Sequence, residues 1–299
     1  MNNCSLIGFG NWGKKIFRNI QLFNELNIKY ICKQNLDNLD LINLKINTTN
    51  NYKKAINDEI DSVFIVSPSE THYEISKFAL INKKNVFVEK PICLMDKQFQ
   101  ELINIAKKNS LILHINYIHL YNENFTDLTE RFKSEYENNE KVCLKIILGN
   151  NGPIRLNTSP FQDWAPHIFS IMNYVLGMKE YKLVKYKIFL NENNASIYNV
   201  YLSFVYKNFI IKTFFGNNFA KKNTTVKILT TNKKYEYYDK YSYIYSEDNY
   251  QKLNFQKKTP LEKSIKQFVD SCNGVKIQQL ENMSNITSQI ERIQNKLNK

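Results

Sequence analysis

The sequence has no long apolar run and no closely spaced cysteines. No stretch approaches the roughly 20 apolar residues that a membrane-spanning helix needs, and no basic segment followed by an apolar one stands at the N-terminus. The five cysteines are odd in number and scattered, without CxxC or HxxxH spacing. We therefore expect a cytoplasmic protein with no metal site, neither membrane-bound nor secreted, whose cysteines are reduced and mostly structural.

The composition is that of a folded protein. Hydrophobic residues make up 43% of the chain and aromatic residues 13%, which is enough apolar surface to offset the entropic cost of ordering it. This excludes intrinsic disorder. At about 100 to 200 residues per domain, a chain of 299 residues is expected to form two domains.

Acidic residues are fewer than basic ones. Lys and Arg number 41 and Asp and Glu 28, so the formal net charge is +13. Such a charge is typical of nucleic-acid binding, but the lysines are scattered in short pairs such as Lys14-Lys15 and Lys221-Lys222 rather than along one helix face. We therefore favour attraction of an anionic small substrate, such as a nucleotide-linked sugar, over nucleic-acid binding.

Three of the 8 glycines lie in one hexapeptide near the N-terminus, Gly8-Phe9-Gly10-Asn11-Trp12-Gly13, between an apolar strand at 4–7 and a helical pattern. In a GxGxxG turn the first glycine allows the tight turn, the second lets the backbone approach a pyrophosphate, and the third lets the helix pack closely. The first amides of the helix would point at the phosphates. The hexapeptide therefore predicts a dinucleotide-binding turn.

Strands and helices alternate through the first 115 residues. Apolar runs predict strands at 4–7, 29–32, 45–48, 62–66, 85–88 and 111–115, and periodic stripes predict helices at 52–56, 71–81 and 96–108. This alternation indicates an α/β Rossmann domain with a doubly wound parallel sheet and right-handed crossovers. Its ligand would bind at the carboxyl ends of the strands.

The motifs at these strand ends resemble those of one enzyme family. They are Gly8–Gly13, Val66-Ser67-Pro68-Ser69-Glu70-Thr71-His72 and Val88-Glu89-Lys90-Pro91. Together they resemble the glucose-fructose oxidoreductase, inositol dehydrogenase and MocA (Gfo/Idh/MocA) family of NAD(P)-dependent oxidoreductases, of which Glu-Lys-Pro is the most specific mark. The Trp12-Gly13-Lys14 continuation is similar to members that act on nucleotide-activated sugars.

The second half of the chain has a different pattern. Short β runs predict strands at 142–148, 183–190, 196–204, 209–215, 226–230 and 235–238, joined mostly as antiparallel hairpins. We expect a Rossmann domain over 1–120 and an α+β substrate-binding domain over 121–299, whose C-terminal helices could pack back on the first domain. The resemblance implies a large open-faced sheet that pairs subunits into a homodimer or homotetramer.

A second candidate motif is Asp163-Trp164-Ala165-Pro166-His167. Pro166 suits the first turn of a helix, so we place a helix start there, with Asp163 and His167 on one face. The carboxylate could then orient the imidazole. An isolated pair of this kind would more often be a cap and a partly buried histidine, but the family resemblance implies a histidine beside the substrate.

The resemblance implies hydride transfer between a nicotinamide and a hydroxyl or keto carbon of a sugar or nucleotide-activated sugar. Such a reaction needs an acid/base group that titrates near neutral pH. We expect His167 to relay the proton, Asp163 to orient it and Lys90 to polarise the reacting oxygen. The roles of Lys90 and His167 could be exchanged, and a cis Lys90–Pro91 peptide bond fits the motif.

The cofactor-binding prediction comprises the turn residues Gly8, Gly10, Asn11, Trp12 and Gly13, the strand-end residues Ser67, Pro68, His72 and Glu89, and Lys33. Lys33 stands where an acidic residue would bind the ribose diol of NAD, so the choice between NAD and NADP leans slightly to NADP. The substrate-binding prediction comprises Asn116, His119 and Arg155. His119 could substitute for a basic pair that the family carries after the sixth strand.

Three alternatives to this enzyme stay open. The chain could be a catalytically silent relative that binds cofactor or sugar, because a fold alone confers no activity. It could reduce a non-sugar ligand, such as a linear tetrapyrrole. Nucleic-acid binding comes last.

Overall fold

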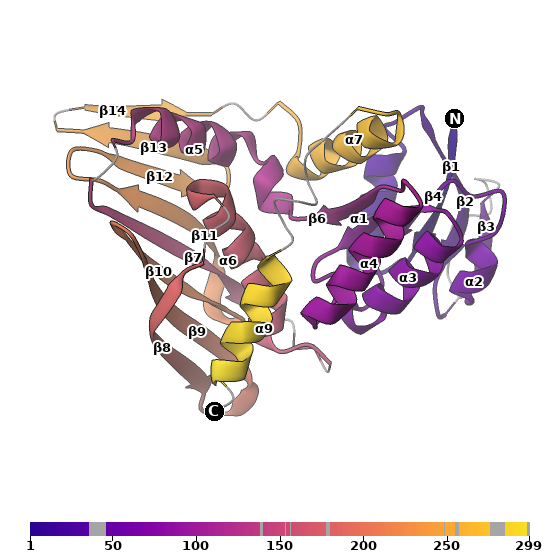
Figure 1. Ribbon diagram of the computed structural model, residues 1–299, viewed down its shortest axis with the longest axis horizontal. Helices are drawn as coiled ribbons and strands as arrows, with labels where there is room; N and C mark the ends of the chain where they lie inside the picture. The colour runs from indigo at the N-terminus through magenta and orange to yellow at the C-terminus, as the bar shows by residue number, and fades with distance from the viewer. Residues whose placement is uncertain are drawn as a thin grey trace. The chain divides into compact units, whose positions relative to one another are not determined.

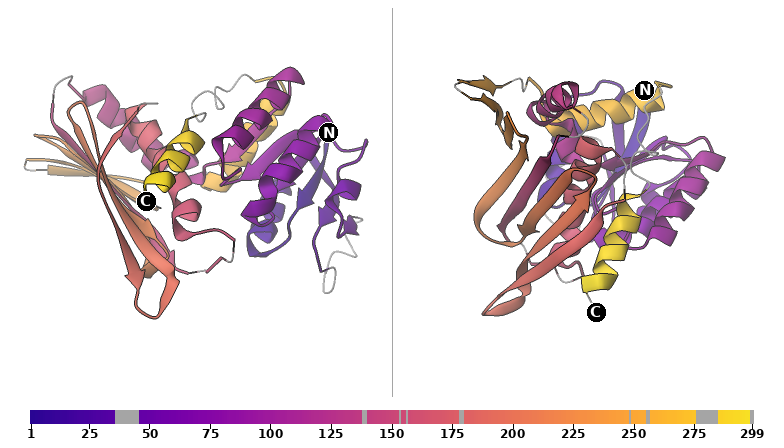
Figure 2. Two further views of the ribbon diagram at one scale, coloured as in Figure 1. Left: turned by 60° about the horizontal axis from the view of Figure 1, so that its bottom comes forward. Right: turned by 60° about the vertical axis from the view of Figure 1, so that its left-hand side comes forward.

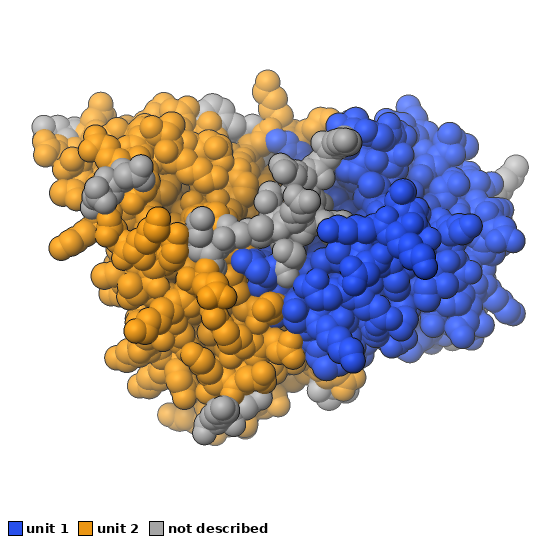
Figure 3. Space-filling view, viewed as in Figure 1, with its two compact units in different colours: residues 1–117, 261–287 blue, residues 118–260, 288–299 orange. Residues whose placement is uncertain are grey.

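The computed structural model describes residues 1–35, 46–137, 140–152, 154–155, 157–177, 180–247, 249–254, 257–275 and 285–297. The chain divides into two compact units, shown in different colours in Figure 3. Unit 1 comprises Met1–Tyr117 and Leu261–Thr287, and unit 2 comprises Ile118–Pro260 and Ser288–Lys299. Lys45, expected to begin a strand, lies outside the described residues.

Unit 1 is built on a six-stranded parallel sheet (Figure 1). Its strands are β1 (Asn2–Ile7), β2 (Leu26–Cys32), β3 (Asn47–Thr49), β4 (Ser62–Ile65), β5 (Asn85–Glu89) and β6 (Leu113–Asn116). The spatial order is β3-β2-β1-β4-β5-β6, and every residue of β4 and β6 is buried, as parallel strands covered on both faces require. The expected doubly wound Rossmann sheet is confirmed. Its order reverses between β1 and β4, where ligands of this fold bind.

The described helices of unit 1 bury residues against its sheet. They are α1 (Asn11–Ile20), α2 (Tyr52–Ala55), α3 (His72–Ile81), α4 (Asp96–Lys108) and α7 (Pro260–Cys272). The expected stripe of α4 is confirmed, since Phe99, Leu102, Ile103 and Ala106 are all buried. The C-terminal helix α7 packs on the sheet through Phe268, whose ring centroid lies 5.3 Å from that of Phe64 and 5.7 Å from that of Phe87.

Unit 2 contains an eight-stranded sheet in the order β14-β13-β12-β11-β7-β10-β9-β8. Its strands are β7 (Val142–Asn151), β8 (Lys182–Asn191), β9 (Asn194–Tyr206), β10 (Phe209–Gly216), β11 (Asn218–Leu229), β12 (Lys234–Tyr238), β13 (Tyr241–Ser246) and β14 (Asn249–Leu253). Among the strand pairs of this sheet that the structure describes, β7 and β10 are parallel and the others are antiparallel, so the expected mostly antiparallel sheet is confirmed. The strands β13 and β14 are additional to those predicted from the sequence.

One face of this sheet is covered by helices, as the views in Figure 2 show. The described helices of unit 2 longer than one turn are α5 (Glu123–Glu135), α6 (Pro160–Leu176) and α9 (Ile286–Leu297). Helix α5 packs on β12 and β13, and α6 packs on β7, β9 and β10. Burial therefore alternates along β10, where Phe209 and Ile211 are buried while Ile210 and Lys212 are exposed.

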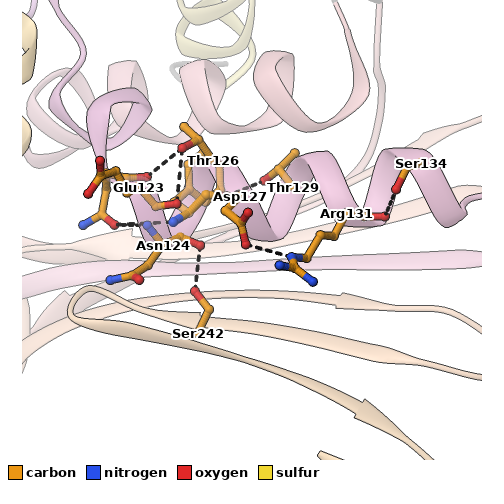
Figure 4. Close-up of polar contacts among 10 residues, drawn as sticks. Glu123, Asn124, Thr126, Asp127, Thr129, Arg131, Ser134 and Ser242 are labelled. Carbon is orange, nitrogen blue, oxygen red and sulfur yellow. Dashed lines mark hydrogen bonds and ion pairs between the residues drawn. The ribbon is translucent and has the colours of Figure 1, made fainter. Parts of the chain in front are cut away.

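Helix α5 is fixed at its N-terminus by polar contacts (Figure 4). The Asn122 side chain caps it by accepting from the amides of Asn124 and Phe125. The Ser242 hydroxyl of β13 donates to the Asn124 carbonyl at 2.7 Å. The Ser242–Asn124 contact joins the helix to β13 of the sheet.

The start of α6 differs from the expected one. The helix begins at Pro160, so Pro166 lies inside it rather than in its first turn. The cause is a capping box, in which the Ser159 hydroxyl accepts from the Gln162 amide while the Gln162 side chain accepts from the Ser159 amide. Pro160 occupies the first helical position, where a missing N–H costs nothing. Asp163 therefore lies in the first turn of α6, and His167 lies four residues further along the helix.

Candidate functional site

The glycine turn after β1 is closely packed against the loop after β4. Gly8 has φ +101°, and a Cβ on it would lie 2.6 Å from the backbone of Val66 and Ser67. A Cβ on Gly13 would lie 2.2 Å from the Gly8 carbonyl oxygen, so α1 packs directly on the turn. Only glycine fits either position.

Gly10 has a different environment. It is exposed, and a Cβ built on it would have nothing within 4 Å. It is also the N-cap of α1 and gives the helix no side-chain cap. The first amides of α1 can therefore donate hydrogen bonds to an anion at an accessible point of the backbone, where the helix dipole favours negative charge.

His72 joins the loops after β4 and β5. One ring nitrogen, Nδ1, lies 2.8 Å from the Pro91 carbonyl oxygen, and Nε2 lies 2.7 Å from that of Ser67. Burial lowers the pKa of His72, and the charge of Lys90 acts in the same direction. The structure thus gives His72 a bridging position, and its direct contact with a cofactor stays a prediction.

Glu89 and Lys90 stand at the carboxyl end of β5. The Glu89 Oε1 atom accepts from the Trp12 indole Nε1 at 2.6 Å and from the Asn116 amide Nδ2 at 2.6 Å. Burial raises the pKa of Glu89, and these two donors and the positive charge of Lys90 oppose that rise. The Lys90–Pro91 peptide bond is cis, as expected. The Glu-Lys-Pro motif therefore contacts the glycine turn through Trp12.

Lys33 lies at the same edge of the sheet. It follows β2, and its amide donates to the Thr49 carbonyl at 3.0 Å. Because β1 and β2 are parallel neighbours, Lys33 and the glycine turn come from adjacent strand ends. No acidic side chain occupies the sequence Cys32-Lys33-Gln34.

In unit 2 the structure brings two predicted site histidines together. The rings of His119 and His167 are 4.9 Å apart between centroids and nearly perpendicular, at 85°. The Trp164 ring lies 6.0 Å from that of His167. His119 comes from a short 3-10 helix at Ile118–Tyr121, and His167 is buried on α6. Nothing in the spacing of these histidines along the sequence predicts the contact.

Arg155 and Asp163 also meet in unit 2. The Arg155 Nε atom donates to Asp163 Oδ2 at 3.1 Å, and the Asp163 side chain is 16% exposed. The predicted substrate residue Arg155 therefore pairs with the predicted orienting residue Asp163. The role of Asp163 in orienting His167 stays a prediction.

A further set of contacts in unit 1 was not predicted. Ser264 of α7 donates to the Asn116 side-chain oxygen at 2.8 Å and lies 3.0 Å from His114 Nε2. Ser264 and Asn116 are 148 positions apart in the sequence, so no local pattern indicates this contact. Asn116, predicted to bind substrate, is fully buried, and that role stays a prediction.

Within the ranges given above, no group of three or more His, Cys, Asp or Glu side chains is placed to hold a metal ion. No helix in the described part of the chain is long and apolar enough to cross a membrane.

A doubly wound sheet with a GxGxxG turn at its switch point defines a dinucleotide-binding Rossmann protein. Residues 2–117 match the GFO_IDH_MocA family, described as an oxidoreductase family with an NAD-binding Rossmann fold. The Glu-Lys-Pro strand end lies within that segment. Over these residues, the Rossmann segment of the chain matches the Gfo/Idh/MocA family.

Curated relatives match part of this chain. The chain is 26% identical over 181 residues to the myo-inositol 2-dehydrogenase of Thermotoga maritima, a match that covers 58% of this chain and 54% of the relative. The match therefore spans about half the length of that curated relative.

Two solved structures share the fold over nearly the whole chain. A 3-ketoreductase from Actinomadura kijaniata, in complex with NADP and TDP-benzene, superimposes with a TM-score of 0.87 at 12% identity, covering 98% of this chain and 97% of that one. A UDP-N-acetylglucosamine 3-dehydrogenase from Acidithiobacillus ferrooxidans superimposes with a TM-score of 0.79 at 14% identity, covering 97% and 95%. At these identities the likeness establishes the fold of both units.

The different surroundings of Gly8 and Gly10 lead to a prediction in which each substitution is the control for the other. Gly8→Ala should lower the free energy of unfolding by about 2 kcal/mol or more, because its Cβ meets backbone at a positive φ. Gly10→Ala should change it by less than about 1 kcal/mol, yet weaken NADH or NADPH binding at least about tenfold by blocking backbone approach. Urea unfolding and fluorescence titration measure the two effects. Equal stability losses in both variants would contradict this description of the turn.

Proposed function

We propose that the protein is an NAD(P)-dependent oxidoreductase that transfers a hydride between the nicotinamide and a hydroxyl or keto carbon of a sugar or nucleotide-linked sugar. The observation that carries the proposal is the joining of the GxGxxG turn to the Glu-Lys-Pro strand end through the Trp12–Glu89 hydrogen bond. This contact sets Lys90 next to a residue of the dinucleotide turn. When bound, the nicotinamide supplies or accepts the hydride.

The residues around the turn suit a dinucleotide. The accessible backbone at Gly10 and Asn11 and the uncapped amides of α1 suit a pyrophosphate. Ser67, after β4, borders the same turn, because a Cβ on Gly8 would lie 2.6 Å from the backbone of Val66 and Ser67, and Pro68 follows Ser67 in the chain. Lys33 after β2 would suit a 2′-phosphate, so we propose a slight preference for NADP.

The acid/base chemistry is assigned to two groups. Oxidation of an alcohol carbon requires removal of its hydroxyl proton as the hydride leaves. In our proposal Lys90 polarises the reacting oxygen and holds its developing charge, while His167 moves the proton and Asp163 orients the imidazole. The exchange of roles between Lys90 and His167 remains the alternative assignment.

The proposed substrate class rests on the net charge of the chain and on the substrates in the names of its relatives. The formal charge of +13 attracts anionic ligands, and Arg155 and His119 add a cation and a polar ring on the same unit as His167. The named relatives include an inositol dehydrogenase and a nucleotide-sugar dehydrogenase. We therefore propose a sugar, polyol or nucleotide-linked sugar as the substrate.

The proposed chemistry predicts a separation of turnover from binding. Lys90→Ala and His167→Ala should each lower kcat at least about a hundredfold, measured as the change in reduced dinucleotide with a panel of inositols and nucleotide sugars. The dinucleotide Kd should stay within about threefold of the wild type, because neither side chain supplies the backbone amides of the turn.

Lys108→Ala is the matched control, since Lys108 is an exposed lysine at the end of α4. It should leave kcat unchanged. Near wild-type turnover in Lys90→Ala or His167→Ala would show that the residue has been given the wrong role. A wild-type protein that binds dinucleotide but turns over no substrate would support the catalytically silent alternative.

We also propose that the open face of the eight-stranded sheet pairs two or more copies of the chain. Exposed aliphatic side chains face each other across two of its strands, since Ile210 of β10 pairs with Val205 of β9 and they are 48% and 38% exposed. Phe189 of β8 and Phe214 of β10 add two rings, 5.6 Å apart between centroids. Exposed apolar side chains gathered on one sheet face are typical of an interface.

The proposed subunit interface should not tolerate an introduced charge. Ile210→Glu should convert a dimer or tetramer into monomers, because it would bury an unpaired carboxylate in the contact. Ile81→Glu is the control, since Ile81 is a 56% exposed isoleucine on α3 of unit 1. Size-exclusion chromatography with light scattering gives the mass of each. A monomeric wild type, or an Ile210→Glu variant of unchanged mass, would refute the interface.

A further inference from the structure

Five side chains of unit 1 form one continuous hydrogen-bond chain, which we call the Glu89 chain. Four contacts link its members. His114 Nε2 lies 3.0 Å from Ser264 Oγ, and Ser264 Oγ lies 2.8 Å from Asn116 Oδ1. Asn116 Nδ2 and Trp12 Nε1 each lie 2.6 Å from Glu89 Oε1. The Glu89 chain thus begins at His114 of β6, passes through Ser264 of α7 and returns to Asn116 at the end of β6. From there it reaches Glu89 at the end of β5 and the glycine turn.

The direction of each hydrogen bond follows from proton counting. A carboxylate accepts only, so the Asn116 amide must turn its NH₂ group to Glu89 and its oxygen to Ser264. The single hydroxyl proton of Ser264 then goes to that oxygen, which leaves Ser264 Oγ to accept from His114. His114 must therefore carry its proton on Nε2.

The neutral state of His114 fits this assignment. Burial lowers the pKa of His114 to about 3, so at neutral pH the ring has one N–H. The ring is held between Phe87, stacked at 4.9 Å with an interplanar angle of 11°, and Phe268, edge-on at 5.8 Å. Both the orientation and the tautomer of His114 are therefore fixed by its surroundings.

Along the Glu89 chain, each hydrogen bond is donated to the next member in the direction of Glu89. The register of β5 and β6 sets Glu89 opposite Asn116, so the backbone itself aligns these two side chains. Ser264 then orients the Asn116 amide, and the oriented amide leaves Glu89 Oε1 as the acceptor for the indole of Trp12. Trp12 lies in the first turn of α1, next to Gly13 and to the amides that face the dinucleotide.

We infer that Ser264 is a positioning residue for the dinucleotide, acting through Asn116 and Glu89 to hold Trp12 and the first turn of α1 in the binding geometry. This inference rests on the proposed binding of NAD(P). It assigns a role in the N-terminal turn to a residue on the C-terminal helix α7. Ser264 is fully buried, and its hydroxyl contacts His114 and Asn116 rather than the turn itself.

The test uses Trp12 as its own reporter. The sequence has 2 tryptophans, so a Trp164→Phe background leaves Trp12 as the only one. In that background Ser264→Ala should shift the emission of Trp12 to longer wavelength and increase its quenching by acrylamide, because the indole loses its fixed acceptor. The Kd for NADPH and NADH should rise about fivefold to tenfold.

Two further variants separate positioning from stability. Ser264→Thr keeps the hydroxyl and should restore both the Trp12 emission and the Kd. Ser76→Ala is the matched control, since Ser76 is a fully buried serine of α3 whose hydroxyl has no hydrogen-bond partner among the described residues. It should leave Trp12 emission and Kd unchanged, whatever it does to the urea midpoint.

A variant at the other end covers the case in which Ser264→Ala does not fold. Trp12→Phe removes the indole N–H at a partly exposed site and should raise the Kd for NADPH, measured by calorimetry, by a similar factor. Unchanged Trp12 emission and Kd in Ser264→Ala, or an unchanged Kd in Trp12→Phe, would overturn the inference.

Failure of the proposed function gives a different result. If the wild type binds neither NADPH nor NADH, then dinucleotide binding is wrong and the role of Ser264 in it falls too. A Trp12 emission shift in Ser264→Ala without ligand would then still show that the Glu89 chain holds the indole. The two failures are therefore distinguished by the ligand-free spectrum.

Discussion

The burial of the Glu89 carboxylate at the end of β5 constrains the whole candidate cofactor site. A buried carboxylate costs free energy unless donors compensate it, and here the donors come from the glycine turn and from β6. Because one of these donors is Trp12, the need to compensate Glu89 also links the glycine turn to β5, the strand that Lys90 follows. Gly8 and Gly13 complete this arrangement, because a side chain at either would collide with backbone. The turn, the motif and the strand end therefore form one packed assembly.

The Rossmann features were predictable because they are local. The glycine turn, the Glu-Lys-Pro end and the buried stripe of α4 each lie within one short segment, and β4 and β6 are apolar throughout. Parallel pairing and strand order then follow from general rules of handedness. The cis Lys90–Pro91 bond was expected for the same reason, since it belongs to the motif itself.

The remaining features depend on contacts between distant segments or on competing local signals. Pro160 and Pro166 could each begin α6. The capping box formed by Ser159 and Gln162 places the start of the helix at Pro160. Strands β13 and β14 carry mixed polar and aromatic residues, and they become strands because β13 pairs with β12 and β14 pairs with β13. The contact of Ser264 with Asn116 and that of His119 with His167 arise from tertiary packing alone.

Direct titration of the wild-type protein with NAD, NADH, NADP and NADPH tests the central claim most directly. Fluorescence and mass spectrometry of the purified protein would also detect cofactor carried through purification. We expect micromolar binding of at least one redox pair, with the proposed slight preference for the NADP pair through Lys33. Absence of binding by all four dinucleotides would contradict it, because the packed turn around Gly10 and Glu89 would then have no dinucleotide to hold.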